Sequence, residues 1–289
     1  MRGFELDIPL GRIAGLRWGE PGAPRVLALH GWLDNAASFV PLAAEFERIG
    51  TRVDLVAPDL PGHGRSVHLP PGADYSFAGA LHSVLDVADA LDWERFALLG
   101  HSMGAGIASL AGAGAPGRVD RLLAIEALGA LPEAPENTVR RLREAVAAAR
   151  ALPGKRLRVF PDIEPAVRAR MQANGLGEAA ARLLVERGVR AVRGDDGVDG
   201  YQWSSDPRLT LPTMVRMTEA QVRDLVAGIQ CPARVIYADP PQPYLPEPLR
   251  SEHARLLPHG EQVVLRGGHH MHMEDPAAVA AAIGAFFGR

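Results

Sequence analysis

The run Leu98-Leu99-Gly100-His101-Ser102-Met103-Gly104-Ala105 decides how this chain is expected to fold. An apolar stretch predicts a buried strand over Phe96–Leu99. It leads directly into Gly-x-Ser-x-Gly, and a helix-compatible run follows over Met103–Ala111. In such a setting the serine lies on a strained turn between strand and helix, and its hydroxyl projects above the sheet. Glycine at positions 100 and 104 lets neighbouring backbone approach closely. Ser102 is therefore the candidate nucleophile.

Short strand-like runs alternate with longer helical patterns on both sides of this stretch. Such alternation is typical of an α/β fold, with a mostly parallel sheet flanked by helices. Several of the strand candidates are continuously apolar, as expected for strands buried on both faces. The predicted strands are Arg25–Leu29, Asp54–Ala57, Phe96–Leu99, Leu122–Ile125, Arg234–Ala238 and Gln262–Leu265. The predicted helices are Ala36–Arg48, Ala78–Leu91, Met103–Ala111 and Pro276–Phe287.

Residues 132–212 interrupt the alternation. They contain no convincing strand, but Arg140–Ala151 and Ala179–Val192 have helical patterns, with arginines on one side that we interpret as solvated faces. An insertion of this length between two strands of an α/β sheet resembles a cap over a site. We therefore predict a core formed by residues 1–131 and 213–289, and a helical cap formed by residues 132–212.

Composition excludes several classes of function. The chain has 289 residues and a formal net charge of −3, without the basic clusters expected of a nucleic-acid-binding protein. Its only cysteine, Cys231, excludes an intramolecular disulfide and is expected to be a buried thiol. No apolar run is long enough to span a bilayer, and the N-terminus lacks the features of a secretory signal. We expect a cytoplasmic protein; the sequence predicts no oligomeric state.

A second loop follows the predicted strand Arg25–Leu29 and reads His30-Gly31-Trp32-Leu33-Asp34-Asn35. An acyl-transfer enzyme needs two backbone N–H groups directed at the oxyanion, one after the nucleophile and one from an earlier loop. Trp32 and Met103 occupy the matching positions. We interpret His30 as structural. Asp59, which begins a further loop, is expected to hold its turn by local hydrogen bonds.

Three histidines, at positions 269, 270 and 272, follow the last predicted strand. A serine nucleophile requires a histidine base from another loop, and this loop is suitably placed. A crowd of histidines is also compatible with a metal site. However, no cysteine or carboxylate set completes a recognisable ligand spacing, so no metal is expected.

Two carboxylates are candidates for the acid that orients the base. Glu126 directly follows the apolar run Leu122–Ile125, where a carboxylate is costly to bury unless it is paired. A histidine that becomes protonated during catalysis would be a suitable partner. Asp239 directly follows the predicted strand Arg234–Ala238.

Taken together, several of these motifs resemble the α/β-hydrolase superfamily in their order and spacing, over nearly the whole chain apart from the cap. They are His30-Gly31-Trp32, Asp59–Ser66, Gly100–Gly104 and Gly268-His269 with Glu274-x-Pro276. Residues 30–35, 200–204 and 268–272 resemble more narrowly the serine-hydrolase-like proteins. The resemblance implies an α/β-hydrolase fold without a cofactor. It also implies that the base is His269, five positions before Glu274, with His270 as the alternative and His272 as a supporting residue.

The chain departs from the family pattern at the acid. Alignment of the strand Arg234–Ala238 puts Pro241 where an aspartate is usual. Asp239 is two residues short, so it would orient the histidine only if its loop bends unusually. Glu126-Ala127 resembles the arrangement in haloalkane dehalogenases, which place the acid after the earlier strand. Glu126 is therefore preferred and Asp239 is the alternative; a third possibility is that both are structural and the triad is degraded.

These expectations combine into one predicted function. The protein is expected to be a serine hydrolase (esterase-like, EC 3.1.1) that acts on a small-molecule carboxylic ester or related acyl substrate. Ser102, His269 and Glu126 would form the triad. Tyr201 and Trp203 either line the substrate pocket or pack the cap. The alternatives are a non-catalytic small-molecule-binding protein, a cofactor-free haloperoxidase-like enzyme and a C–C-bond hydrolase. Dehalogenase and epoxide-hydrolase chemistry is disfavoured, because there the nucleophile is an aspartate.

Overall fold

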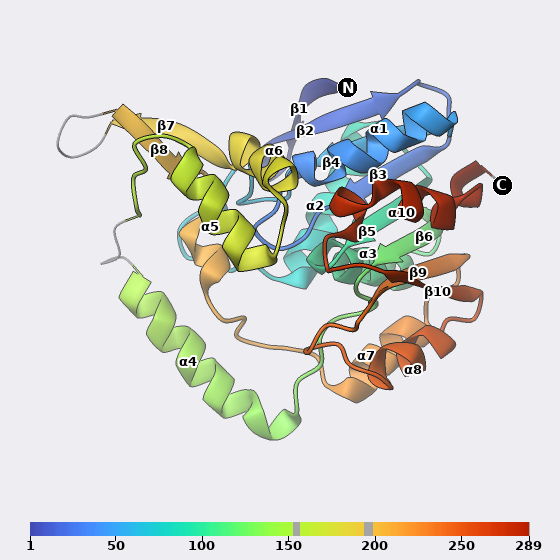
Figure 1. The fold of residues 1–289 in the computed structure, drawn as a ribbon. Helices are drawn as coiled ribbons and strands as arrows, with labels where there is room; N and C mark the ends of the chain where they lie inside the picture. The colour runs from blue at the N-terminus through green and yellow to red at the C-terminus, as the bar shows by residue number, and fades with distance from the viewer. Residues whose placement is uncertain (153–156, 194–198, 289) are drawn as a thin grey trace.

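A computed structural model describes residues 1–152, 157–193 and 199–288 (Figure 1). Within these residues, eight strands form one sheet in the order β1-β2-β4-β3-β5-β6-β9-β10. β1 pairs antiparallel with β2 and β2 antiparallel with β4, whereas all other neighbours are parallel. The strands are β1 (Arg2–Ile8), β2 (Gly11–Gly19), β3 (Arg25–Leu29), β4 (Asp54–Pro58), β5 (Phe96–His101), β6 (Val119–Ile125), β9 (Ala233–Asp239) and β10 (Gly260–Arg266).

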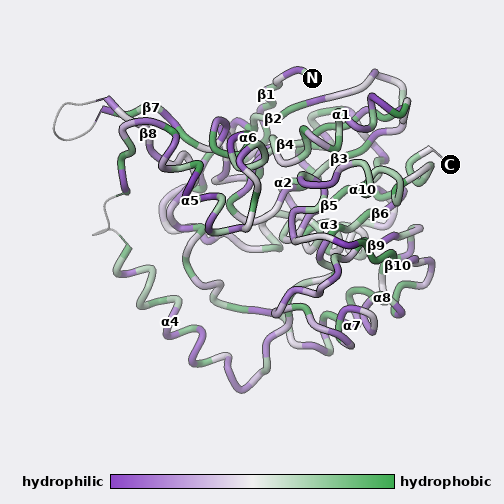
Figure 2. The backbone as a smooth tube through the Cα atoms, viewed as in Figure 1, coloured by the Kyte–Doolittle hydropathy of each residue, from purple (hydrophilic) through white to green (hydrophobic). Residues whose placement is uncertain are grey.

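Helices cover both faces of this sheet, which is why its central strands are continuously apolar. In β3, Leu27 and Leu29 pack toward α2 and α3, whereas Val26 and Ala28 pack toward α1 and α10. Figure 2 shows the hydrophobic colouring gathered in the sheet and the helices packed on it. The helices of this core are η1 (Ala36–Phe39), α1 (Val40–Ile49), α2 (Phe77–Ala90), α3 (Met103–Gly114), α7 (Glu219–Ala227), α8 (Leu249–Arg255), α9 (Met271–Glu274), α10 (Pro276–Ile283) and η5 (Phe286–Gly288).

All of the predicted strands are present, but the sequence did not predict β1 and β2. These two form an antiparallel hairpin at the edge of the sheet, with Ile8 opposite Gly11. In β1 only every second residue faces the protein: Phe4, Leu6 and Ile8 alternate with exposed polar side chains. An edge strand that is apolar on one face carries a weaker sequence signal than a strand buried on both.

The insertion between β6 and β9 contains η2 (Pro135–Asn137), α4 (Thr138–Ala151), α5 (Glu164–Asn174), α6 (Glu178–Gly188), β7 (Val189–Arg193), β8 (Asp199–Trp203) and η4 (Pro207–Thr210). The prediction that it lacks strands is wrong, because β7 and β8 form an antiparallel hairpin. The helix predicted over Ala179–Val192 ends at Gly188. Val189 and Val192 belong to a short ribbon that is mostly exposed, so its alternation is too brief to distinguish from a helical pattern. The boundaries of the cap stay a prediction.

The insertion is fixed to the loops at the carboxyl ends of the strands. Asn35, in the loop after β3, donates its side-chain N–H to the carbonyl of Leu184 in α6, at 2.8 Å. Glu274 in α9 accepts a hydrogen bond from the backbone N–H of Gly177, at 2.9 Å. By contrast, α4 lies at the periphery (Figure 1), and Ala145 is its one buried residue among those described. α5 and α6 therefore lie over the carboxyl ends of the strands, where Ser102 is expected.

Cys231 is half-buried rather than fully buried, because it lies just before β9 at the margin of the core. Partial burial still raises the pKa of its thiol to about 11. Among the residues that the structure describes, no helix is long and apolar enough to cross a membrane.

Candidate active site

Ser102 lies between the last residue of β5 and the first residue of α3. Its backbone has φ 52° and ψ −117°, a conformation that is unfavourable for a residue with a side chain. Backbone strain of this kind costs about 1–3 kcal/mol and persists only where the surroundings impose it. Here the Ser102 N–H donates to the carbonyl of Ile125 in β6, at 2.9 Å. The structure therefore forms the strained turn that the sequence predicts.

The two glycines of the motif are required by close backbone contacts. A Cβ atom at Gly104 would lie 2.0 Å from the carbonyl oxygen of Leu29 in β3. A Cβ atom at Gly100 would lie 2.5 Å from the Cα of Ala105, in the first turn of α3. Both distances are far too short for a side chain. The glycines thus let α3 begin directly against the sheet, with Ser102 at its N-terminus.

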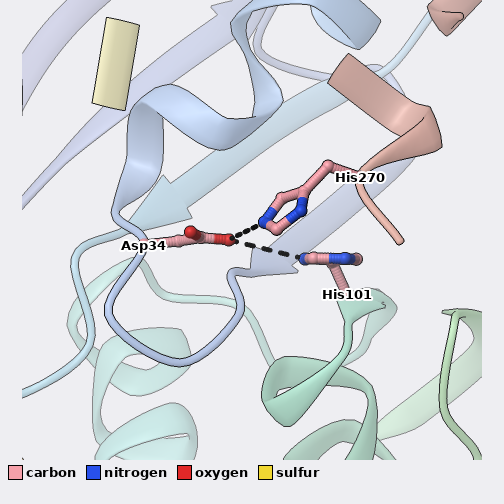
Figure 3. A group of neighbouring side chains, drawn as sticks. All are labelled: Asp34, His101 and His270. Atoms are coloured by element: carbon pink, nitrogen blue, oxygen red, sulfur yellow. Dashed lines mark ion pairs between the residues drawn. The ribbon is translucent and has the colours of Figure 1, made fainter. Parts of the chain in front are cut away.

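His269 extends from the loop after β10 to Ser102. Its Nε2 atom lies 2.9 Å from the Ser102 Oγ, within the range expected for a general base and the proton that it accepts. The imidazole is partly exposed, at 19% of its side-chain surface, so a substrate can approach it. The alternative base, His270, is directed toward Asp34 (Figure 3), and its Nε2 lies 3.3 Å from that carboxylate.

Glu126 meets the other side of the same imidazole. Its Oε2 atom lies 3.2 Å from the Nδ1 of His269, and its Oε1 accepts a hydrogen bond from the Ala238 N–H, at 2.5 Å. The residue is only 2% exposed and has φ 61°. A buried carboxylate must be paired, and here both oxygens have partners. Because Nδ1–H donates to Glu126, the lone pair of Nε2 is directed at Ser102.

The alternative acid, Asp239, has an exposed side chain at the end of β9. Its backbone carbonyl accepts from the Gly267 N–H, at 3.2 Å, but no contact within the described residues joins its carboxylate to His269. The loop that follows contributes a residue that the sequence analysis missed. The Tyr244 hydroxyl lies 3.1 Å from the Nδ1 of His269, and burial raises its pKa to about 12. The proline-rich loop thus supplies a phenol, Tyr244, three residues after Pro241, which occupies the position where the family usually has an aspartate.

Two backbone positions were predicted to bind an oxyanion. Met103 is the first residue of α3, where the helix leaves its N–H groups without internal partners and carries a partial positive charge. Trp32 lies in the loop after β3, and its indole N–H donates to the carbonyl of Leu209 in the insertion, at 2.8 Å. Its side chain is 53% exposed. Both residues therefore border the same end of the sheet as Ser102.

His30 has a structural position, as expected. Its Nδ1–H donates to the Gly31 carbonyl, at 2.8 Å, and its Nε2 accepts from the Leu60 N–H, at 2.9 Å. The imidazole is fully buried, and this burial lowers its pKa to about 4. Both ring nitrogens of the neutral form are therefore engaged, and neither is available for proton transfer.

Asp59 also has the structural position that its sequence predicts. Its carboxylate accepts hydrogen bonds from the backbone N–H groups of Ala36 and Arg65, each at 2.8 Å. In addition it pairs with the guanidinium of Arg187 in α6, at 2.8 Å. Asp59 therefore joins two loops of the core to the insertion. It has no part in the proposed triad.

Tyr201 and Trp203, the candidate pocket residues, lie on β8. Tyr201 exchanges two backbone hydrogen bonds with Phe160, each 2.7 Å long. The indole of Trp203 contacts the Phe160 ring edge-on, with ring centres 6.0 Å apart. These contacts pack the hairpin of the insertion, and a role of either side chain in a pocket stays a prediction.

Comparison with known proteins places this chain in a family. The sequence pattern of the alpha/beta hydrolase family matches residues 26–282, so the chain belongs to that family. It is 31% identical to a serine hydrolase-like protein of Dictyostelium discoideum, over 97% of this chain and 80% of that protein. A crystal structure of a hypothetical protein from Pseudomonas aeruginosa is 39% identical, with a TM-score of 0.90 and full coverage of both chains. The thioesterase domain from the curacin biosynthetic pathway is 28% identical, with a TM-score of 0.82 over 98% of each chain. Family and relatives support a hydrolase.

Proposed function

We propose that this protein is a serine hydrolase that cleaves carboxylic esters or related acyl compounds through an acyl-enzyme. The observation that carries the proposal is the chain of contacts from Ser102 Oγ to His269 Nε2, 2.9 Å, and from His269 Nδ1 to Glu126 Oε2, 3.2 Å. Nucleophile, base and orienting acid are then in the relation that this chemistry requires.

In the first step Ser102 attacks the acyl carbonyl carbon. A bond forms between Oγ and that carbon while His269 Nε2 takes the hydroxyl proton, and the carbonyl electron pair moves onto oxygen. Glu126 stabilises the imidazolium. The N–H groups of Trp32 and Met103 would donate to the oxyanion, and each such donor is worth roughly 100- to 1,000-fold in rate.

The second step releases the alcohol or thiol. The oxyanion reforms the carbonyl, the bond to the leaving group breaks, and His269 gives its proton to that group. Water then attacks the acyl-enzyme with His269 again as base, which yields the carboxylic acid and restores Ser102. Every proton is carried by His269, so no other side chain has to transfer a proton.

One comparison supports an ester or thioester as the acyl substrate. The curacin domain, 28% identical over nearly the whole chain, is named a thioesterase, and thioesters and oxygen esters share the same acyl-enzyme chemistry. The haloperoxidase-like and C–C-bond-hydrolase alternatives would use the same residues. They differ in substrate, so ester and thioester turnover is the discriminating observation.

The proposal is tested by hydrolysis of p-nitrophenyl esters of increasing acyl length, with S102A as the nucleophile variant. We expect turnover that S102A abolishes. S251A is the matched control, because Ser251 lies on α8 and donates to Glu247, at 2.9 Å, away from the triad. Equal turnover by wild type and S102A would contradict the proposal. A folded wild-type protein inert to every ester and thioester would favour the non-catalytic alternative.

A further inference from the structure

A second polar group lies beside the proposed triad. It consists of Asp34 from the loop after β3, His101 at the end of β5 and His270 before α9 (Figure 3). These side chains are almost completely buried, with exposures of 2%, 0% and 4%. One carboxylate oxygen and two imidazole nitrogens of the three residues lie within 4.8 Å of one another. Buried polar atoms normally have hydrogen-bond partners, so their contacts need an explanation.

The tautomer of His101 is fixed by its hydrogen bond to a backbone carbonyl. Its Nε2 lies 2.9 Å from the backbone carbonyl of His269, and a carbonyl can only accept, so Nε2 carries the proton. The lone pair of Nδ1 then faces the Asp34 Oδ2 atom at 3.6 Å. Neither atom has a hydrogen-bond partner among the described residues. A charge-assisted hydrogen bond would be about 2.7–2.9 Å long, so the two acceptors face each other without a proton between them.

His270 approaches the same carboxylate oxygen. Its Nε2 lies 3.3 Å from Asp34 Oδ2, yet that oxygen accepts no hydrogen bond from any residue that the structure describes. Its other ring nitrogen, Nδ1, has no hydrogen-bond partner among the described residues. With the proton on Nδ1, the Nε2 lone pair joins those of Asp34 Oδ2 and His101 Nδ1 around a small buried space. Glycine at position 31 keeps this space open, because a Cβ atom there would lie 2.9 Å from both Asp34 Oδ2 and His101 Nδ1. Buried acceptors that converge in this way are costly unless a cation lies among them.

The distances distinguish a metal ion from a water molecule. Ligands of a tetrahedral ion at about 2.0–2.1 Å lie about 3.4 Å apart. Groups that share one water at about 2.8 Å lie about 4.6 Å apart. The two distances from Asp34 Oδ2, 3.3 and 3.6 Å, match the first value, and the two imidazole nitrogens lie within 4.8 Å of each other. We propose that Asp34 Oδ2, His101 Nδ1 and His270 Nε2 form a binding site for a divalent transition-metal ion such as Zn²⁺, since carboxylate and imidazole ligands suit that class.

The surroundings have the form expected around metal ligands. The second oxygen of Asp34 pairs with the guanidinium of Arg170 in α5, and His101 donates its other N–H to a backbone carbonyl. Ligating carboxylates and histidines are commonly held in this manner. The third proposed ligand, His270, lacks such support, since its Nδ1 has no hydrogen-bond partner among the described residues. The charge of Arg170 opposes that of an ion, but Asp34 lies between the two. The sequence predicted no metal, because its spacing does not show that Asp34 and His101 become neighbours.

An ion in this position would join three loops that carry the proposed catalytic groups. We therefore expect it to raise the melting temperature, because it binds the folded chain and finds no such site in the unfolded chain. The direct test is a titration of chelator-dialysed protein with Co²⁺ and Zn²⁺, followed by calorimetry and by visible absorption of bound Co²⁺. The expected result is one ion per chain, intense tetrahedral-type cobalt bands and a higher melting temperature.

Variants show whether the ion occupies this site. D34N and H270N should each weaken binding at least 10- to 100-fold, the loss commonly caused by removal of an outer partner alone. The matched control is H253N, since His253 is also buried, at 1%, and lies 2.9 Å from a carboxylate, that of Glu219. If D34N does not fold, as judged by circular dichroism, the metal affinity of H270N is compared with that of H253N.

The proposal is overturned if the wild-type protein binds no ion, or if D34N and H270N bind as tightly as H253N. The same titration with S102A separates this site from the proposed hydrolase activity. S102A should bind the metal like wild type, because Ser102 is not a ligand. Loss of esterase activity together with intact metal binding would therefore affect only the proposed function.

Discussion

The Glu126 carboxylate lies 3.2 Å from the Nδ1 of His269, across the carboxyl ends of β6 and β10. The acid thus comes from the strand next to that of Ser102, whereas the loop after β9 contributes Tyr244, whose hydroxyl lies 3.1 Å from the same nitrogen. This pairing makes Glu126, and not Asp239, the group that would orient the base. It leads to predictions that separate the two carboxylates.

E126Q is expected to lower kcat/KM by about 10³–10⁴-fold, because an amide cannot stabilise the imidazolium or fix its tautomer. The carbonyl of the new amide side chain can still accept from the Ala238 N–H, so stability should change little. E126A would leave that N–H unpaired at a further cost of about 1–3 kcal/mol in unfolding free energy. D239N is the control and should keep wild-type kinetics with the same ester. A larger loss in D239N than in E126Q would reverse the assignment.

Y244F should have a smaller effect. It removes one hydrogen bond to His269, and such a bond is worth about 0.5–1.5 kcal/mol, or roughly 2- to 10-fold in rate. Steady-state kinetics with a p-nitrophenyl ester measure it, with Y237F as the control because the Tyr237 hydroxyl has no hydrogen-bond partner among the described residues. If Y244F is as damaging as E126Q, the phenol rather than the carboxylate orients the base.

Stability should depend on pH through buried histidines. Burial lowers the pKa of His30 to about 4 and that of His63 to about 3. The unfolded chain therefore binds more protons than the folded chain below an ordinary histidine pKa of about 6.5. The unfolding free energy should be constant above that pH and fall steadily toward pH 4. Each histidine would contribute about 2–3 kcal/mol to this fall.

Urea denaturation between pH 8 and pH 4 measures this dependence. H63N should flatten the fall, whereas H82N, which changes a histidine at the surface of α2, should leave it unchanged. His101 and His272 are also fully buried, and burial lowers the pKa of both, so part of the dependence should remain in H63N. An unfolding free energy that does not fall below pH 6 would contradict the neutral, buried state of these side chains.

G104A tests the close contact behind the strained turn. The new Cβ would meet the Leu29 carbonyl at 2.0 Å, so α3 must move away from the sheet. Overpacking of this kind costs about 1–3 kcal/mol, and the shift of Ser102 should remove most activity. G117A is the matched control, because a Cβ there would meet no atom within 4 Å. Thermal denaturation and ester hydrolysis of both variants distinguish the outcomes; a fully active G104A would contradict the geometry.

The sequence predicts most of the parts that depend on local patterns. The strands before Ser102 and Glu126 are recognisable because residues buried on both faces form continuous apolar runs. The proposed role of Ser102 follows from a short motif, and that of Glu126 from its place after such a run. The choice of His269 among three neighbouring histidines rests on the resemblance to the α/β-hydrolase superfamily. β1 and the hairpin β7–β8 are less evident, since each is apolar on at most one face. β2 is buried on both faces, but glycines and arginines interrupt its apolar residues in the sequence.

Contacts between distant segments cannot be predicted from local sequence patterns. Nothing near Asp34 in the sequence indicates that Arg170 pairs with it, or that His101 lies 3.6 Å from it. These contacts result from the packing of α5 and of three separate loops. Tyr244 is similar: the path of the proline-rich loop, rather than a pattern in it, brings the phenol to His269.

The central claim, that Ser102 is a nucleophile activated by His269, is tested most directly by labelling with a fluorophosphonate probe and locating the modified residue by mass spectrometry. We predict a single label on Ser102 in the wild-type protein, a label that is lost in S102A and strongly reduced in H269A. Label on another residue, or a folded wild-type protein that takes up none, would contradict the account.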